Sequence, residues 1–168
     1  MRGHATSPWD LRERAFEDWL ASVRAGYRIA RSLADDVAMV GVSTGGALAL
    51  RFAAERPSGL AGVAAVAAPL KFVNRAMMVV PLVHGANKLV RWVSNFEGVM
   101  PFRDNETENP DINYRNIPVR GLYELRRLTA ELEERLPEID TDVLIVQGDG
   151  DPVVEPESAT LLQELLVN

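Results

Sequence analysis

Apolar side chains recur every three or four residues near the start of the chain. Ser7-Pro8-Trp9-Asp10 is typical of a helix start, with a hydroxyl cap and a proline at the first helical position. The apolar positions beyond it are Phe16, Trp19, Leu20, Val23, Tyr27 and Ala30. Their spacing predicts one buried face of an amphipathic helix that ends near Leu33.

Short apolar runs further along predict strands. They cover Val37–Val42, Leu60–Ala68 and Asp142–Gln147. We expect these strands to be buried on both faces, as in a parallel sheet. Predicted helices at Gly45–Glu55 and Glu157–Val167 follow the first and third runs. Strand, helix and strand form a βαβ unit, so the sequence predicts an α/β fold with a mostly parallel sheet and flanking helices.

The stretch between Lys71 and Ile139 interrupts this alternation. It contains a polar segment, Arg103–Asp111, and a helical pattern from Val119 to Leu136 with a leucine stripe. The stripe consists of Leu122, Leu125, Leu128 and Leu132. An insertion of this size between two strands is more typical of a lid than of a loop. We therefore expect residues 1–70 and 140–168 to form a core and residues 71–139 a helical cap.

Composition narrows the class of function. The 168 residues predict one domain, or two at most, and their net charge of −6 disfavours nucleic acid as a partner. The chain has no cysteine, which excludes disulfides, thiolate metal sites and a cysteine nucleophile, and fits a cytoplasmic location. No apolar run is long enough for a membrane span, and the first residues lack the apolar core of a signal peptide. No motif indicates a metal or another cofactor.

One motif carries chemistry. Gly41-Val42-Ser43-Thr44-Gly45-Gly46 fits the pattern G-x-S-x-G, and its serine lies between a predicted strand and a predicted helix. At such a sharp turn the flanking glycines leave room for a strained backbone, and the serine hydroxyl projects from the sheet. The amide of Thr44 would then face a developing oxyanion. The alternative is a glycine-lined turn whose serine only caps the helix.

A second acidic turn follows the last predicted strand. In the segment from Leu144 to Val154, Asp149 and Asp151 lie after the strand's carboxyl end, where catalytic groups gather in parallel sheets. An acid here can orient a histidine and stabilise its charged form. The alternative is that these acids are solvated turn formers.

Together these segments resemble the α/β-hydrolase superfamily, in particular its bacterial carboxylesterase and monoacylglycerol-lipase-like branch. The matching features are the turn around Ser43, the cap-sized insertion, the segment Gly148-x-x-Asp151-Pro152-Val153 and the opening Arg2-Gly3-His4-Ala5-x-Ser7. The resemblance implies a partial α/β-hydrolase fold with a helical cap. It makes Ser43 the nucleophile, Asp151 the triad acid with Asp149 as the alternative, and Thr44 an oxyanion donor through its backbone.

In that superfamily the triad histidine follows the acid, and the residues after Asp151 include none. His4 lies in the segment resembling a structural turn, and His84 lies in the predicted cap, where a substrate contact fits better than a base. The second oxyanion donor would come from a loop before Met1. We therefore expect a chain truncated at both ends and inactive by itself.

These features predict a carboxylic ester hydrolase that uses a Ser-His-Asp mechanism on a small-molecule ester. The alternatives are a non-catalytic binding or interaction module, and an acyltransferase with the same nucleophile. The candidate acyl pocket of the cap consists of Met77, Met78, His84, Trp92 and Phe96. Because the predicted sheet would have two bare edges, we also expect a homodimer that joins sheet edges.

Overall fold

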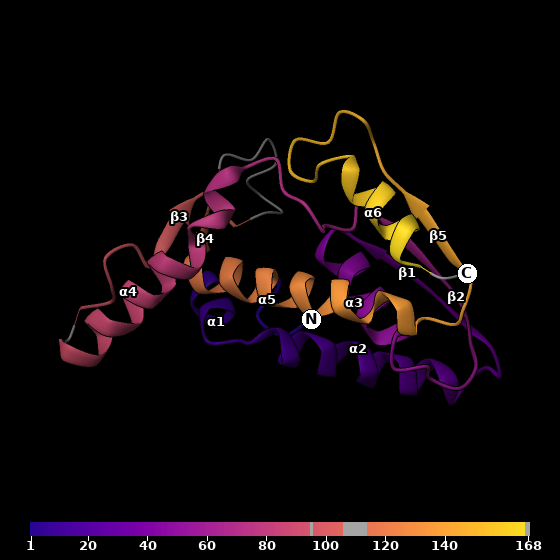
Figure 1. Cartoon of the computed structure of the whole chain (residues 1–168). Coiled ribbons are helices and arrows are strands. Elements are labelled where there is room, and N and C mark those ends of the chain that lie inside the picture. Colours follow the sequence, from indigo (N-terminus) through magenta and orange to yellow (C-terminus); the bar gives the residue numbers. More distant parts are fainter. Residues whose placement is uncertain (95, 106–113, 167–168) are drawn as a thin grey trace. The chain divides into compact units, whose positions relative to one another are not determined.

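The computed structural model describes residues 1–94, 96–105 and 114–166 (Figure 1). Its α-helices are α1 (Pro8–Arg12), α2 (Phe16–Arg31), α3 (Thr44–Ala53), α4 (Val80–Val93), α5 (Val119–Arg135) and α6 (Glu157–Leu165). Two short 3-10 helices are η1 (Arg75–Met78) and η2 (Leu136–Glu138). The strands are β1 (Val37–Val42), β2 (Leu60–Val66), β3 (Phe102–Asp104), β4 (Asn116–Pro118) and β5 (Val143–Val146). No helix of the described residues is long and apolar enough to cross a membrane.

The chain divides into two compact units. The first contains Met1–Asp18 and Arg75–Arg126, and the second contains Trp19–Asn74 and Arg127–Asn168. This division differs from the predicted core and cap, because the chain start groups with residues 75–126. The end of the predicted cap groups with the strands, since Leu128, Leu132 and Leu136 are fully buried in the second unit.

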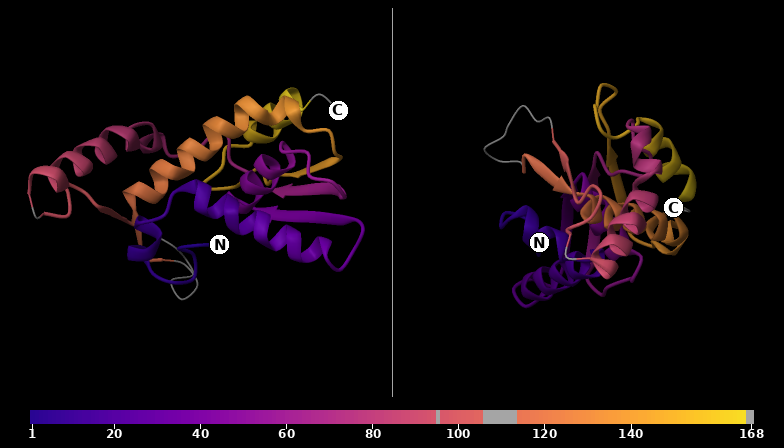
Figure 2. Two further views of the ribbon diagram at one scale, coloured as in Figure 1. Left: turned by 90° about the horizontal axis from the view of Figure 1, so that it is seen from below. Right: turned by 90° about the vertical axis from the view of Figure 1, so that its left-hand side faces the viewer.

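The second unit is built on a three-stranded parallel sheet in the order β1-β2-β5, whose strands run side by side in Figure 2. In register, Val42 lies opposite Val66 and Val66 lies opposite Val146. Helix α3 contacts β1 and β2 and connects them as a βαβ unit. The three predicted strands and the parallel sheet are therefore confirmed, although β2 and β5 are shorter than expected.

The expectation that these strands are buried on both faces is wrong. On one face Val63 and Ala65 are 3% and 0% exposed. The other face carries exposed apolar side chains on both outer strands, namely Val40, Val42, Leu144 and Val146. Val40 is 75% exposed, because within the described residues α3 covers the opposite face only. The apolar side chains on this face of β1 and β5 are therefore exposed in the part of the chain that the structure describes.

The helix predicted from Ser7 to Leu33 is two helices. Ser7 caps α1 as expected, with its side chain accepting the Asp10 N–H at 3.1 Å. The chain then leaves the helix at Glu13–Ala15, and the Asp18 carboxylate accepts the Ala15 N–H at 3.2 Å. The Phe16 N–H is taken by the Glu124 carboxylate at 3.3 Å, so a distant side chain satisfies a donor that an unbroken helix would have used.

The other predicted helices are confirmed with small shifts at their ends. α3 begins one residue before Gly45, α5 covers the predicted leucine stripe, and α6 ends at Leu165. The predicted polar segment is in part a strand, because Arg103 and Asp104 belong to β3, which pairs antiparallel with β4. Its residues 106–111, like Val167 at the end of the last predicted helix, lie outside the described residues.

Candidate active site

Ser43 occupies the turn between β1 and α3. Its backbone has φ +51° and ψ −122°, a left-handed conformation that costs a residue with a side chain about 1–3 kcal/mol. The turn is held by the Ser43 N–H, which donates to the Val66 carbonyl at 2.8 Å. The Ser43 side chain makes no capping hydrogen bond to α3. The alternative in which Ser43 serves only as a helix cap is therefore not supported.

Two glycines make this turn sterically possible. A methyl group on Gly41 would lie 2.2 Å from the Gly45 carbonyl oxygen, and one on Gly46 would lie 3.0 Å from the Ala68 Cβ. At Gly45 the same atom would meet nothing within 4 Å. The expectation that Gly41 and Gly45 provide the room is therefore half correct, because the second crowded position is Gly46.

Thr44 is the first residue of α3. Its N–H belongs to the first turn, where amides lack intrahelical acceptors and favour negative charge. A second left-handed residue, Ala67 with φ +48°, follows β2 at the same sheet edge, and its N–H donates to the Val146 carbonyl at 2.8 Å. Sequence reasoning missed Ala67, since alanine carries no signal for this conformation.

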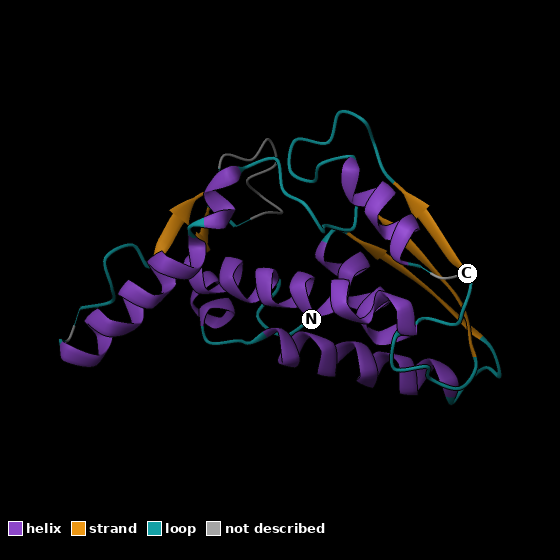
Figure 3. Cartoon of the chain, in the orientation of Figure 1, coloured by secondary structure: helices purple, strands orange, loops and turns teal. Residues whose placement is uncertain are grey.

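Asp151 lies in the loop between β5 and α6, which Figure 3 shows as a long coil. Its Oδ1 accepts the N–H groups of Val153 and Val154 at 2.8 and 2.9 Å. These two hydrogen bonds favour the charged form and lower the pKa of the Asp151 carboxyl group. Asp149 is exposed in the same loop. Asp151 is thus the ordered acid of the pair.

The lowered pKa of Asp151 predicts a pH dependence. Because the folded-state pKa is below the unfolded value of about 3.9, the stabilisation is complete above that value and is lost as pH falls through the folded-state pKa. We expect Asp151→Asn to unfold with less acid dependence than the native chain below about pH 4. Denaturant titrations at several pH values measure this, and equal acid dependence of the two proteins would contradict it.

Ser158 fixes the loops around this edge. It is fully buried on α6, and its Oγ accepts the Leu70 and Lys71 N–H groups at 3.3 and 2.9 Å. Phe72, the residue after Lys71, pairs with Val154 in an isolated antiparallel bridge. The segment after β2 is therefore tied to the segment after β5. Sequence analysis did not identify Ser158, because a serine inside a helix has no distinctive pattern.

Ser43 and Asp151 follow the two outer strands of one parallel sheet, with β2 between them. The carboxyl ends of parallel strands lie at one edge, so both residues extend from the same edge of the second unit. Strand axes two positions apart are about 10 Å apart, which exceeds hydrogen-bond reach. An intervening side chain is needed to couple the two residues.

The remaining candidate residues belong to the first unit. Met77 is 7% exposed, whereas Met78, Trp92 and Phe96 are 71%, 83% and 76% exposed. His84 stacks on Tyr123, with ring centroids 4.2 Å apart, and burial lowers its pKa. The Nδ1 of His4 lies 3.4 Å from the Arg2 carbonyl oxygen, and burial lowers the pKa of this imidazole as well.

The part of the chain that the structure describes contains no group of three or more His, Asp or Glu side chains placed to hold a metal ion.

Comparison with known proteins decides the family. The model of the family described as "Serine aminopeptidase, S33" matches residues 1–167. The chain belongs to this family. It is a serine hydrolase family of the α/β-hydrolase type.

Two curated relatives of this S33-family chain are bacterial enzymes. It is 28% identical to a thermostable monoacylglycerol lipase of Bacillus sp. (strain H-257), covering 96% of this chain and 61% of the lipase. It is 26% identical to a carboxylesterase of Bacillus subtilis (strain 168), covering 95% of this chain and 62% of the esterase. The chain thus spans about three fifths of the length of these relatives.

Solved structures show the same fold. A metagenome-derived lipolytic enzyme described in a study of LipS and LipT superposes with a TM-score of 0.80 at 25% identity, covering 97% of this chain and 64% of that one. The monoacylglycerol lipase of Paleococcus ferrophilus gives a TM-score of 0.67 at 20% identity, covering 92% and 62%. This S33-family chain therefore has a partial α/β-hydrolase fold.

Proposed function

We propose that the chain carries the nucleophile and the acid of a carboxylic ester hydrolase. The observation that carries the proposal is the left-handed backbone of Ser43, whose side chain makes no helix-capping hydrogen bond, at the sheet edge shared with Asp151. Ser43 would attack the ester carbonyl, and the Thr44 N–H would stabilise the tetrahedral oxyanion. The names of the Bacillus relatives, a lipase and a carboxylesterase, support an ester as substrate.

In this proposal the base is a histidine outside the present chain. Asp151 would hold its imidazole in the reactive tautomer, and its carboxylate is already ordered by two backbone amides. Because the outer strands are about 10 Å apart, Ser43 and Asp151 need an intervening side chain such as this imidazole to be coupled. Both histidines of this chain belong to the first unit, whereas Ser43 and Asp151 belong to the second.

Two alternatives remain distinguishable by experiment. A non-catalytic module would leave Ser43 unreactive toward a fluorophosphonate, whereas a nucleophilic Ser43 is labelled. An acyltransferase would form more ester product with an added alcohol than free acid. The family assignment and the lipase and esterase relatives favour hydrolysis.

We propose that apolar side chains of the first unit receive the acyl group. Met78, Trp92 and Phe96 expose large apolar surfaces, and methionine adapts to chains of varied shape. We expect Met78→Asp or Trp92→Asp to weaken binding of a long-chain ester analogue about tenfold while leaving the unfolding curve unchanged. Calorimetric titration and denaturation measure the two effects. Met77→Asp is the matched comparison, since Met77 is buried and its replacement should destabilise the fold.

We also propose a two-fold dimer. Among the described strands, β1 and β5 each have one neighbour, and both expose apolar side chains on the same sheet face. Such edges favour pairing with a second copy. Light scattering at micromolar concentration should give the mass of a dimer, and Val40→Lys should shift it toward the monomer. A native chain that stays monomeric would contradict this.

A further inference from the structure

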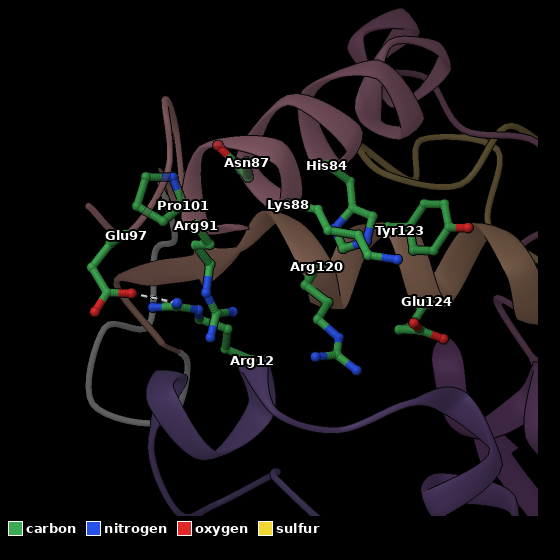
Figure 4. A pocket seen from close by; sticks show the side chains of 10 residues that line it. All are labelled: Arg12, His84, Asn87, Lys88, Arg91, Glu97, Pro101, Arg120, Tyr123 and Glu124. Atoms are coloured by element: carbon green, nitrogen blue, oxygen red, sulfur yellow. Dashed lines mark hydrogen bonds and ion pairs between the residues drawn. The ribbon is translucent and has the colours of Figure 1, made fainter. Parts of the chain in front are cut away.

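The first unit contains a cavity of about 430 Å³ between α4 and the start of α5. Figure 4 shows side chains from α1, α4 and α5 around it. Four of its lining side chains are cationic, namely Arg12, Lys88, Arg91 and Arg120, and two are carboxylates, Glu97 and Glu124. Positive charge is therefore concentrated here in a chain whose net charge is −6.

Some of the charged side chains that line the cavity are held in place by other residues of the first unit. The Arg12 side chain is 6% exposed, hydrogen-bonds to the Glu97 carboxylate and lies over the Trp9 ring at 5.2 Å. Glu124 is 4% exposed and accepts the Phe16 N–H. Arg12, Glu97 and Glu124 thus have defined partners within the fold.

The guanidinium groups of Arg91 and Arg120 have weaker partners. Their guanidinium groups lie 3.8 and 3.9 Å from the carboxylate of Glu13, beyond hydrogen-bond distance. The same carboxylate lies 3.7 Å from Arg12 and is itself 55% exposed. One solvated carboxylate cannot neutralise two guanidinium groups, and Lys88 adds a third charge to the cavity. Guanidinium and ammonium groups are the donors that bind oxyanions in proteins.

An aromatic pair also lines the cavity. The His84 and Tyr123 rings stack with an interplanar angle of 13°. The pKa of His84 is lowered by burial and by the charges of Arg120 and Lys88, with Glu124 acting in the other direction. The neutral form of the imidazole is therefore favoured, and it presents an uncharged aromatic face beside Tyr123.

We propose that this cavity binds a small organic phosphate, whose dianion pairs with Arg91, Arg120 and Lys88 and whose organic part lies on the Tyr123–His84 stack. A phosphate monoester carries a charge near −2 at neutral pH and presents three acceptor oxygens, which suits several guanidinium and ammonium donors in one cavity. A carboxylate has a single charge and two acceptor oxygens, so it should bind more weakly than a phosphate monoester. This inference is independent of the proposed esterase function.

Titration calorimetry of the full chain with phenyl phosphate tests the proposal at about pH 7.5, where the phosphate is a dianion. We expect a Kd of about 1 mM or tighter, weakened at least tenfold by Arg120→Gln and by Arg91→Gln. Arg28→Gln is the matched control, since it removes one positive charge from an exposed position of α2. Circular dichroism checks that each variant is folded, and Arg120→Lys, which keeps the charge but loses the planar donor fork, should bind with intermediate affinity.

Proton NMR provides a second measurement, because the chain has only two histidines. Phenyl phosphate should raise the pKa of His84 and leave that of His4 unchanged. Three results would overturn the proposal: no binding, equal loss in the Arg28→Gln control, or benzoate binding as tightly as phenyl phosphate.

Discussion

Gly41→Ala is expected to destabilise the chain by about 3 kcal/mol, at the upper end of the range for an overpacked core. The added methyl group would lie 2.2 Å from the Gly45 carbonyl oxygen and 2.6 Å from the Gly46 nitrogen. These contacts are with backbone atoms, so no side-chain rotation relieves them. The turn that presents Ser43 would have to open.

Gly45→Ala is the matched control for this prediction. It adds the same methyl group four residues later, in the first turn of α3, where nothing lies within 4 Å. Alanine favours the helix over glycine by up to about 1 kcal/mol, so this variant should be as stable as the native chain or slightly more stable. Denaturant unfolding measures both variants. Similar stabilities would show that the turn is not closed as described.

The second large effect concerns turnover. We expect the chain to hydrolyse p-nitrophenyl butyrate barely above the buffer rate, because in the proposed mechanism the histidine that accepts the Ser43 proton is not part of this chain. Established triads that lose members retain about 10³–10⁴-fold acceleration over water at most, compared with about 10⁶-fold or more for intact enzymes. Initial-rate assays at high protein concentration measure the residual rate.

Ser43→Ala is the control for this assay, and it should differ little from the native chain. Rapid turnover that disappears in Ser43→Ala would contradict the prediction. It would also identify a base within the chain, which His84→Gln and His4→Gln would then separate.

Several features were predictable from the sequence because their causes are local. The uncharged run Val37–Val42 lies between Asp36 and Ser43, and β1 has these bounds. The motif around Ser43 located the strained turn, and Ser7 located the start of α1. In each case neighbouring residues determine the backbone conformation.

Other features depend on residues far away in the chain. The break between α1 and α2 involves Glu124, which is 108 residues from Phe16. The requirement for Gly46 comes from the Cβ of Ala68, and the role of Ser158 from amides 87 and 88 residues earlier. The exposed sheet face also escaped prediction, since an apolar strand pattern does not reveal what covers it.

The central claim is that Ser43 is a nucleophile presented by a strained turn. A fluorophosphonate tests it directly, because a single slow attack per chain is detectable even when water, in place of a histidine, takes the Ser43 proton as fluoride leaves. After long incubation with the probe, intact-mass measurement and peptide mapping should find one adduct, on Ser43, and none in Ser43→Ala. An unmodified Ser43, or adducts distributed over other serines such as Ser7 and Ser58, would contradict the account.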